Sequence, residues 1–174
     1  MRPTLQRFAL CALLAAPMLL GASAPKSGKT TPIANGHGLG LSPGPESLAL
    51  TFSLVQLADG SFVGHGKTQD HANGGWTKFD LTSATFLGDT LFMAGPVTKL
   101  KDAPPFLGVG STVFFGIQDN GNGSGKPGVD SFANGVVPAF LPPGLTIQQI
   151  LVLLGGPPPP EAFKPLASGN FKIH

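Results

Sequence analysis

The sequence predicts an all-β fold: an antiparallel sandwich or partly open barrel of about seven to nine short strands, with one short inserted helix near 146–154. Three observations support this prediction. Apolar residues alternate with small or polar residues along several short segments, which is typical of strands with one buried face. Turn-forming residues separate these segments at near-regular intervals. One segment alone departs from the alternation, and it carries the start and stop signals of a helix.

The first 24 residues are expected to form a signal peptide. Arg2 and Arg7 give a positive start, an apolar run follows over 8–20, and small residues at 22–24 suit cleavage. Pro25 fits the peptidase poorly, which leaves the cleavage position open. The apolar run is shorter than the ~20 residues that a spanning helix needs, so no stable membrane span is expected after cleavage. The expected location is secreted or periplasmic.

Loss of 1–24 would leave a chain without formal net charge. The full chain has 11 Lys and Arg against nine Asp and Glu, and its two arginines lie in the signal segment, so nine lysines remain. A domain without Arg and without a basic excess is not expected to bind nucleic acid, which requires a basic footprint. The single cysteine, Cys11, lies in the same segment, so no disulfide is expected in the mature chain.

Residues 25–46 are rich in Gly, Pro and Ser, and we expect an extended lead-in there, with 33–36 touching a sheet edge. A single β domain is expected over 47–174. Its first strand, over 48–57, alternates strictly and places Leu48, Leu50, Phe52 and Leu54 on one face. Asp59-Gly60 is a strong turn signal before the returning strand, expected over 61–70.

A second hairpin is expected from strands over 76–81 and 84–87 and a return over 90–94. Gly88-Asp89 lies between the last two and suits a type II′ turn. Further strands are expected over 109–118, 129–132 and 170–174. The residues expected to be buried on facing sheets are Phe52, Leu54, Phe86, Phe92, Val113, Phe115 and Ile117.

The segment 138–165 is expected to be an insert that contains the helix. Thr146 and Gln149 form a capping-box pattern before the apolar stretch 147–154, which ends at two glycines. The four prolines at 157–160 predict a stiff, polyproline-like spacer. We interpret the insert as a loop with a helical turn that covers one end of the sheet. The alternative is a helix that binds a partner.

Two sets of residues are weak candidates for metal binding. His65 and His71 would share one face of a regular strand but lie about 20 Å apart at ~3.3 Å per residue, which is too far for one ion. The loop 119–130 is rich in oxygen ligands, among them Asp119, Asn120 and Asp130. It lacks the ligand spacing of an EF-hand, so an Asx-turn connection without an ion is the competing interpretation. No cofactor is expected, with calcium as the alternative.

Four segments, taken in order, resemble a family of bacterial exported modules, the post-COAP domain. They are 52–54, the motif Gly64-His65 with Asp70-His71-Ala72, the motif Asp119-Asn120-Gly121 with 128–132, and the terminal 169–174. The order and rough spacing of these four segments agree with the family pattern over residues 50–174. The longer 119–130 loop, Leu54 and the insert 138–165 depart from the family pattern. The resemblance implies export and a compact β fold, and it implies no catalytic residues.

The sequence shows no convincing nucleophile–base set, so we expect an exported, non-catalytic β module with a binding or structural role at the cell exterior. A protein or glycan at the cell surface would be its partner. Two alternatives stay open: a calcium-binding module that uses the loop 119–130, and a secreted enzyme. The enzyme would assemble its site from His65, Asp70, Asp130 and His174, and their convergence in a concave pocket would favour it.

Overall fold

The computed structural model describes residues 30–41, 47–121, 130–137, 142 and 144–174. The expected signal peptide and residues 122–129 of the long loop lie outside the described residues. The all-β prediction is confirmed, with nine antiparallel strands, one α-helix and one 3₁₀ turn in the described part. The elements are β1 (Thr31–Leu41), β2 (Ser47–Gln56), β3 (Phe62–Asp70), β4 (Trp76–Leu81), β5 (Ser83–Leu87), β6 (Thr90–Lys101), β7 (Thr112–Gln118), β8 (Ser131–Val136), α1 (Ile147–Leu153), η1 (Pro160–Ala162) and β9 (Lys164–Ile173).

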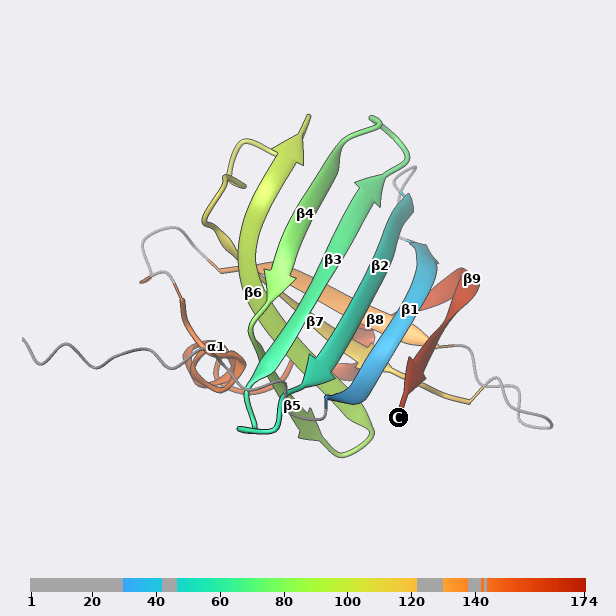
Figure 1. Ribbon diagram of the computed structural model, residues 1–174. Coiled ribbons are helices and arrows are strands. Elements are labelled where there is room, and N and C mark those ends of the chain that lie inside the picture. Colours follow the sequence, from blue (N-terminus) through green and yellow to red (C-terminus); the bar gives the residue numbers. More distant parts are fainter. Residues whose placement is uncertain (1–29, 42–46, 122–129, 138–141, 143) are drawn as a thin grey trace, which may run out of the picture.

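The strands form one sheet that curls into a barrel. They pair in the order β4-β3-β2-β1-β9-β8-β7-β6-β5, and β4 pairs with β6 as well. The long strand β6 allows this closure because β5 pairs with its first half and β4 with its second half. Figure 1 shows β1 to β4 and β6 side by side, with β7 and β8 behind them. The barrel is partly open, since β8 and β9 pair at only two positions, 131 with 165 and 132 with 164.

Strand β1 corrects the expected lead-in over 25–46. This strand lies between β2 and β9 inside the sheet, so the prediction of an edge contact limited to 33–36 was wrong. Its glycines Gly36, Gly38 and Gly40 lie against side chains of β8 and β9, where a Cβ atom would come closer than the 3.0 Å that real Cβ atoms keep. Glycine in a strand leaves room for large neighbours. A Gly-rich run therefore became a strand because facing side chains fill the space above it.

Turn residues behave as expected at the two hairpins. Gly60 has a φ of 85°, and both the hydroxyl and the N–H of Ser61 donate to the Asp59 carboxylate, which lowers the pKa of that carboxyl. Gly88 has a φ of 58°, whereas Asp102 is the one described non-glycine residue with a positive φ. Positive φ at the first central position alone is the signature of a type II′ turn, so that prediction is confirmed.

Four strands have a boundary that differs from the prediction by more than two residues. β8 spans Ser131–Val136 rather than 129–132. β6 continues to Lys101 rather than ending at 94, and β9 begins at Lys164 rather than at 170. β7 begins at Thr112 rather than at 109, because Gly108 to Ser111 form a turn in which the Ser111 N–H donates to the Gly108 carbonyl. The greater lengths of β6 and β9 follow from backbone pairing with distant strands, which the local alternation of residues does not indicate.

The barrel interior holds the main core. Phe52, Leu54, Val113, Phe115 and Ile117 are buried there as predicted. The rings of Phe79 and Phe115 stack across the interior with centroids 4.8 Å apart. The prediction for Phe86 was wrong, because its side chain is 46% exposed near the end of β5, which is the last strand of the sheet.

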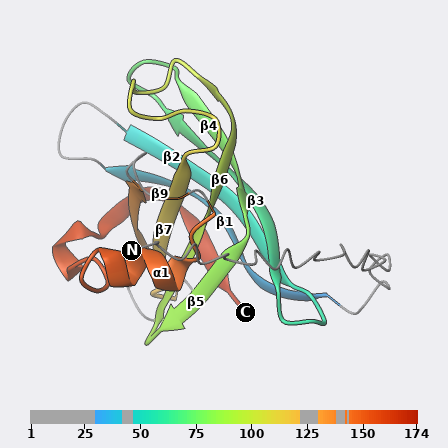
Figure 2. The same ribbon diagram turned by 90° about the vertical axis from the view of Figure 1, so that its left-hand side faces the viewer.

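Helix α1 packs on the outer face of β6 and β7. Ile147, Ile150 and Leu151 form a second buried cluster with Phe92 and its neighbours, so Phe92 is buried on the opposite face of β6 from the one that lines the barrel. Figure 2 shows α1 outside the barrel, beside β5 and β7. The insert therefore covers a face of the sheet, and the expectation that it covers one end was wrong.

The predicted capping box of α1 is confirmed. The Gln149 N–H donates to the Thr146 hydroxyl, and the Thr146 N–H donates to the Gln149 side-chain oxygen at 2.8 Å. The Ile147 N–H donates to the Ser83 hydroxyl at 2.9 Å, which ties the start of the helix to β5. In the part of the chain that the structure describes, no helix is long and apolar enough to cross a membrane.

Candidate functional site

The four residues considered for an enzyme are not brought together. His65 lies exposed on the outer face of β3, whereas Asp70 ends the same strand on its inner face, about 17 Å further along at ~3.3 Å per residue. Asp130 is buried before β8. His174 follows β9, where its Nε2 lies 3.3 Å from the Asn35 amide nitrogen. These four side chains do not form a nucleophile–base set.

Asp70 and His71 belong to the turn between β3 and β4. The Ala72 N–H donates to the Asp70 carboxylate at 2.8 Å, and the Gly75 N–H donates to the Asn73 side chain at 2.6 Å. His71 is exposed in this turn. Among the described residues, no group of three or more His, Cys, Asp or Glu side chains could hold a metal ion. Local Asx-turn bonds therefore engage the side chains of Asp70 and Asn73 in this turn.

Asp119 and Asp130 attach the C-terminal strand to the rest of the barrel. The Asp130 carboxylate accepts the N–H of Asn120 at 2.9 Å and the N–H of Phe171 at 2.7 Å. The Asp119 carboxylate accepts the N–H of Gly121 at 3.0 Å and the N–H of Ile173 at 3.0 Å. Strand β8 does not pair with this part of β9, so the two carboxylates take the place of ladder hydrogen bonds.

This geometry assigns a structural role to both aspartates. Each of the four carboxylate oxygens already accepts a backbone N–H. An Asx-turn connection involves hydrogen bonds within the loop. In the structure the carboxylates also accept backbone N–H groups of β9, which lies 41 positions from Asp130 and 54 from Asp119 in the chain. The remaining part of the loop, 122–129, lies outside the described residues.

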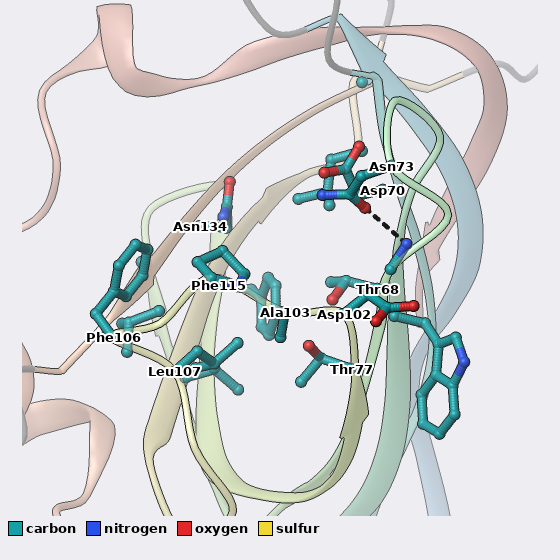
Figure 3. Close-up of a pocket in the computed structure, with 18 of the residues that line it drawn as sticks. Thr68, Asp70, Asn73, Thr77, Asp102, Ala103, Phe106, Leu107, Phe115 and Asn134 are labelled. Atoms are coloured by element: carbon teal, nitrogen blue, oxygen red, sulfur yellow. Dashed lines mark hydrogen bonds between the residues drawn. The ribbon is translucent and has the colours of Figure 1, made fainter.

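A cavity of about 290 Å³ lies at one mouth of the barrel. Its wall is built from the ends of β1 and β3, the starts of β2, β4, β7 and β9, strand β8, and the segment 102–107 that follows β6. Figure 3 shows this cavity with its lining side chains. The mouths of β-barrels are frequent sites of small-molecule binding.

The cavity has an apolar floor and one polar wall. The apolar residues of the lining come from β2, β7, β8 and the 102–107 segment; the main ones are Leu48, Leu107, Val113, Phe115 and Phe132. The polar residues of the opposite wall are Thr68, Asp70, Thr77 and Asp102. In Figure 3 these four lie on the far side of the cavity from Phe106, Leu107 and Asn134.

Two hydroxyl groups of the polar wall have no partner in the described part of the protein. Thr68 and Thr77 face each other across β3 and β4. Thr77 is 5% exposed, and neither hydroxyl forms a hydrogen bond to another described residue. No fully buried polar side-chain atom of the described residues lacks a partner, so the Thr77 hydroxyl opens into the cavity. A buried hydroxyl that faces a cavity without a protein partner is available to a ligand.

Asp102 lies at the rim of the cavity in a left-handed conformation, with a φ of 49°. Its carbonyl oxygen lies so close to Gly75 that a Cβ atom there would collide with it, which shows that the two rim segments are in contact. Its carboxylate lies 3.8 Å from Lys101 in an exposed pair. Backbone strain of this kind is concentrated at functional sites.

Thr68, Thr77 and Asp102 are not among the site residues predicted from the sequence. A threonine in a strand and an aspartate two residues before Pro104-Pro105 are ordinary in sequence, and no local pattern marks them. The only polar residue of the cavity among those predicted site residues is Asp70. Comparison with known protein families, with curated proteins and with solved structures found no match to this chain.

Proposed function

We propose that this protein is an exported, non-catalytic β module that binds a small amphiphilic molecule in the mouth of its barrel. The observation that carries the proposal is the 290 Å³ cavity with an apolar floor and a polar wall that offers unpartnered hydroxyls. This volume is near the lower end of the roughly 300–1,000 Å³ range of ligand pockets, so the ligand is small.

The chemistry of the lining supports binding rather than catalysis. Among the described residues that line the cavity there is no His, Cys, Ser or Tyr, and no threonine hydroxyl of the lining is hydrogen-bonded to a carboxylate that could activate it. His65 and His174 lie elsewhere on the barrel, and Asp130 is occupied by two backbone N–H groups. The secreted-enzyme alternative therefore receives no support from this cavity.

Export is part of the proposal. The positive start, apolar run and small residues of 1–24 support it, as does the resemblance to post-COAP domains. Mass spectrometry of the protein from its native host should find a mature chain that begins near Pro25. Recovery of the full-length chain in the cytosol would contradict export.

A cavity-filling substitution tests the binding site. N-phenyl-1-naphthylamine, a neutral apolar dye, should become fluorescent on binding the wild-type protein with one-to-one stoichiometry. Ala103→Trp should abolish the signal, because Ala103 lines the cavity and an indole would occupy it. Ala58→Trp, in the exposed β2–β3 turn, is the matched control and should bind the dye as the wild type does. Equal dye binding by both variants would show that the dye binds elsewhere.

A further inference from the structure

We infer that the ligand of the barrel mouth is a small organic cation, with its ammonium group against Asp70 and Asp102 and its apolar part against Phe115 and Leu107. This inference rests on the proposed function, because it names the ligand class of the same cavity. It comes from the distribution of charge and hydrogen-bonding groups around the cavity.

The charged groups of the lining favour a cation. Asp70 and Asp102 supply two carboxylates, and Lys164 is the one positively charged residue among the described lining residues. The Lys164 ammonium donates one hydrogen bond to the Glu161 carbonyl at 3.1 Å and keeps its charge, so the charged side chains of the described lining are two carboxylates against one ammonium. Asp70 forms no ion pair with a described residue, and the Asp102 pair with Lys101 is long and exposed, hence weak.

The two carboxylates and the two free hydroxyls share one wall. Asp70 is two residues after Thr68 on β3, so both side chains point to the same face of the strand. Thr77 lies opposite Thr68 on β4, and contact between the Gly75 and Asp102 backbones brings the second carboxylate to the same rim. Figure 3 shows these polar side chains together on one side of the cavity. An ammonium group there could donate to the hydroxyl oxygens while the carboxylates neutralise its charge.

Other ligand classes fit the lining less well. An anion would meet two carboxylates and a single ammonium, that of Lys164, among the described lining residues. A neutral amphiphile could bind the threonine hydroxyls but would leave the Asp70 carboxylate without a counter-charge from a described residue. The apolar floor, which includes Phe115 and Leu107, requires that the cation carry a hydrophobic part rather than be a metal ion.

Three ligands of similar shape and different charge test the inference. Isothermal titration calorimetry would compare 2-phenylethylamine, 2-phenylethanol and phenylacetate on the full mature protein. The amine should bind at least about tenfold more tightly than the alcohol, and phenylacetate should bind most weakly. The advantage of the amine should shrink as salt concentration rises, because partly exposed charges are screened.

Two variants that each remove one carboxylate charge provide a second test of the inference. Asp70→Asn and Asp102→Asn should each reduce the preference for amine over alcohol about tenfold. Asn keeps an oxygen that can accept the Ala72 N–H at position 70 and tolerates the left-handed conformation at position 102. Asp89→Asn, in the exposed β5–β6 turn, should leave the preference unchanged.

Each outcome is decisive. Equal affinities for amine and alcohol, or an amine preference that resists both variants and salt, would overturn the cation inference and leave the proposed binding site intact. Failure of all three ligands and of the neutral dye to bind would overturn both. If a variant does not fold, the salt series and the three ligands on the wild-type protein still decide the question.

Discussion

Asp130→Asn should loosen the attachment of β9 to the barrel. Asp130 is 1% exposed and accepts two backbone N–H groups, one from Asn120 and one from Phe171. An asparagine keeps one acceptor oxygen and places an NH₂ group where the second oxygen was. The backbone N–H of either Asn120 or Phe171 would then face the new NH₂ group, which is also a donor, in a buried position.

The magnitude follows from these contacts. A hydrogen bond to a charged group contributes ~1.5–3 kcal/mol, and a buried donor left without an acceptor costs about 1–3 kcal/mol. Phe171, which the Asp130 carboxylate holds, packs its ring against those of Phe52 and Phe132 in the barrel core. Loss of one bond should therefore lower the free energy of unfolding by about 2–4 kcal/mol.

Urea unfolding of both proteins, with the slope of the transition compared as a check, measures this loss. Hydrogen exchange adds a local readout, since the amides of Phe171 and Ile173 should exchange faster in the variant than those of β2 and β3. Asp89→Asn is the matched control and should change stability by less than ~0.5 kcal/mol. A loss below ~1 kcal/mol for Asp130→Asn, with unchanged exchange at Phe171, would refute the role assigned to this carboxylate.

Three further predictions concern the core, the glycines and calcium. Phe52→Ala should cost about 3–5 kcal/mol in urea unfolding because its ring is buried, whereas the exposed Phe86→Ala should cost little; similar losses would mean the core is misassigned. Gly38→Ala should cost about 1–3 kcal/mol through overpacking, while Gly108→Ala, which has space for a Cβ atom, should be neutral; a neutral Gly38→Ala would show that the β1 packing is wrong. Excess chelator and then millimolar calcium should leave the thermal midpoint unchanged, and a rise of several degrees with calcium that Asp119→Asn and Asp130→Asn both abolish would establish a site in the 119–130 loop.

The sequence by itself determined the elements whose signals are local. Strict alternation located β2, and Gly88-Asp89 identified the turn before β6, because both depend only on neighbouring residues. The capping box of Thr146 and Gln149 likewise located α1. β1 was not predicted as a strand, because the large apolar side chains that pack at its glycine positions belong to other strands. The rings and branched side chains that fill the space over these glycines come from β8 and β9.

Tertiary structure alone decided the site and the role of the acidic loop. Polar residue types drew attention to His65, His71 and the 119–130 loop, but residue type does not tell which strand ends meet at the barrel mouth. Thr68 and Thr77 form one wall only because β3 pairs with β4, and Asp102 reaches that wall only because β6 closes the barrel against β4. Asp130 binds β9 across 41 positions of the chain. Such contacts follow from strand register and closure, which are properties of the whole sheet rather than of any segment.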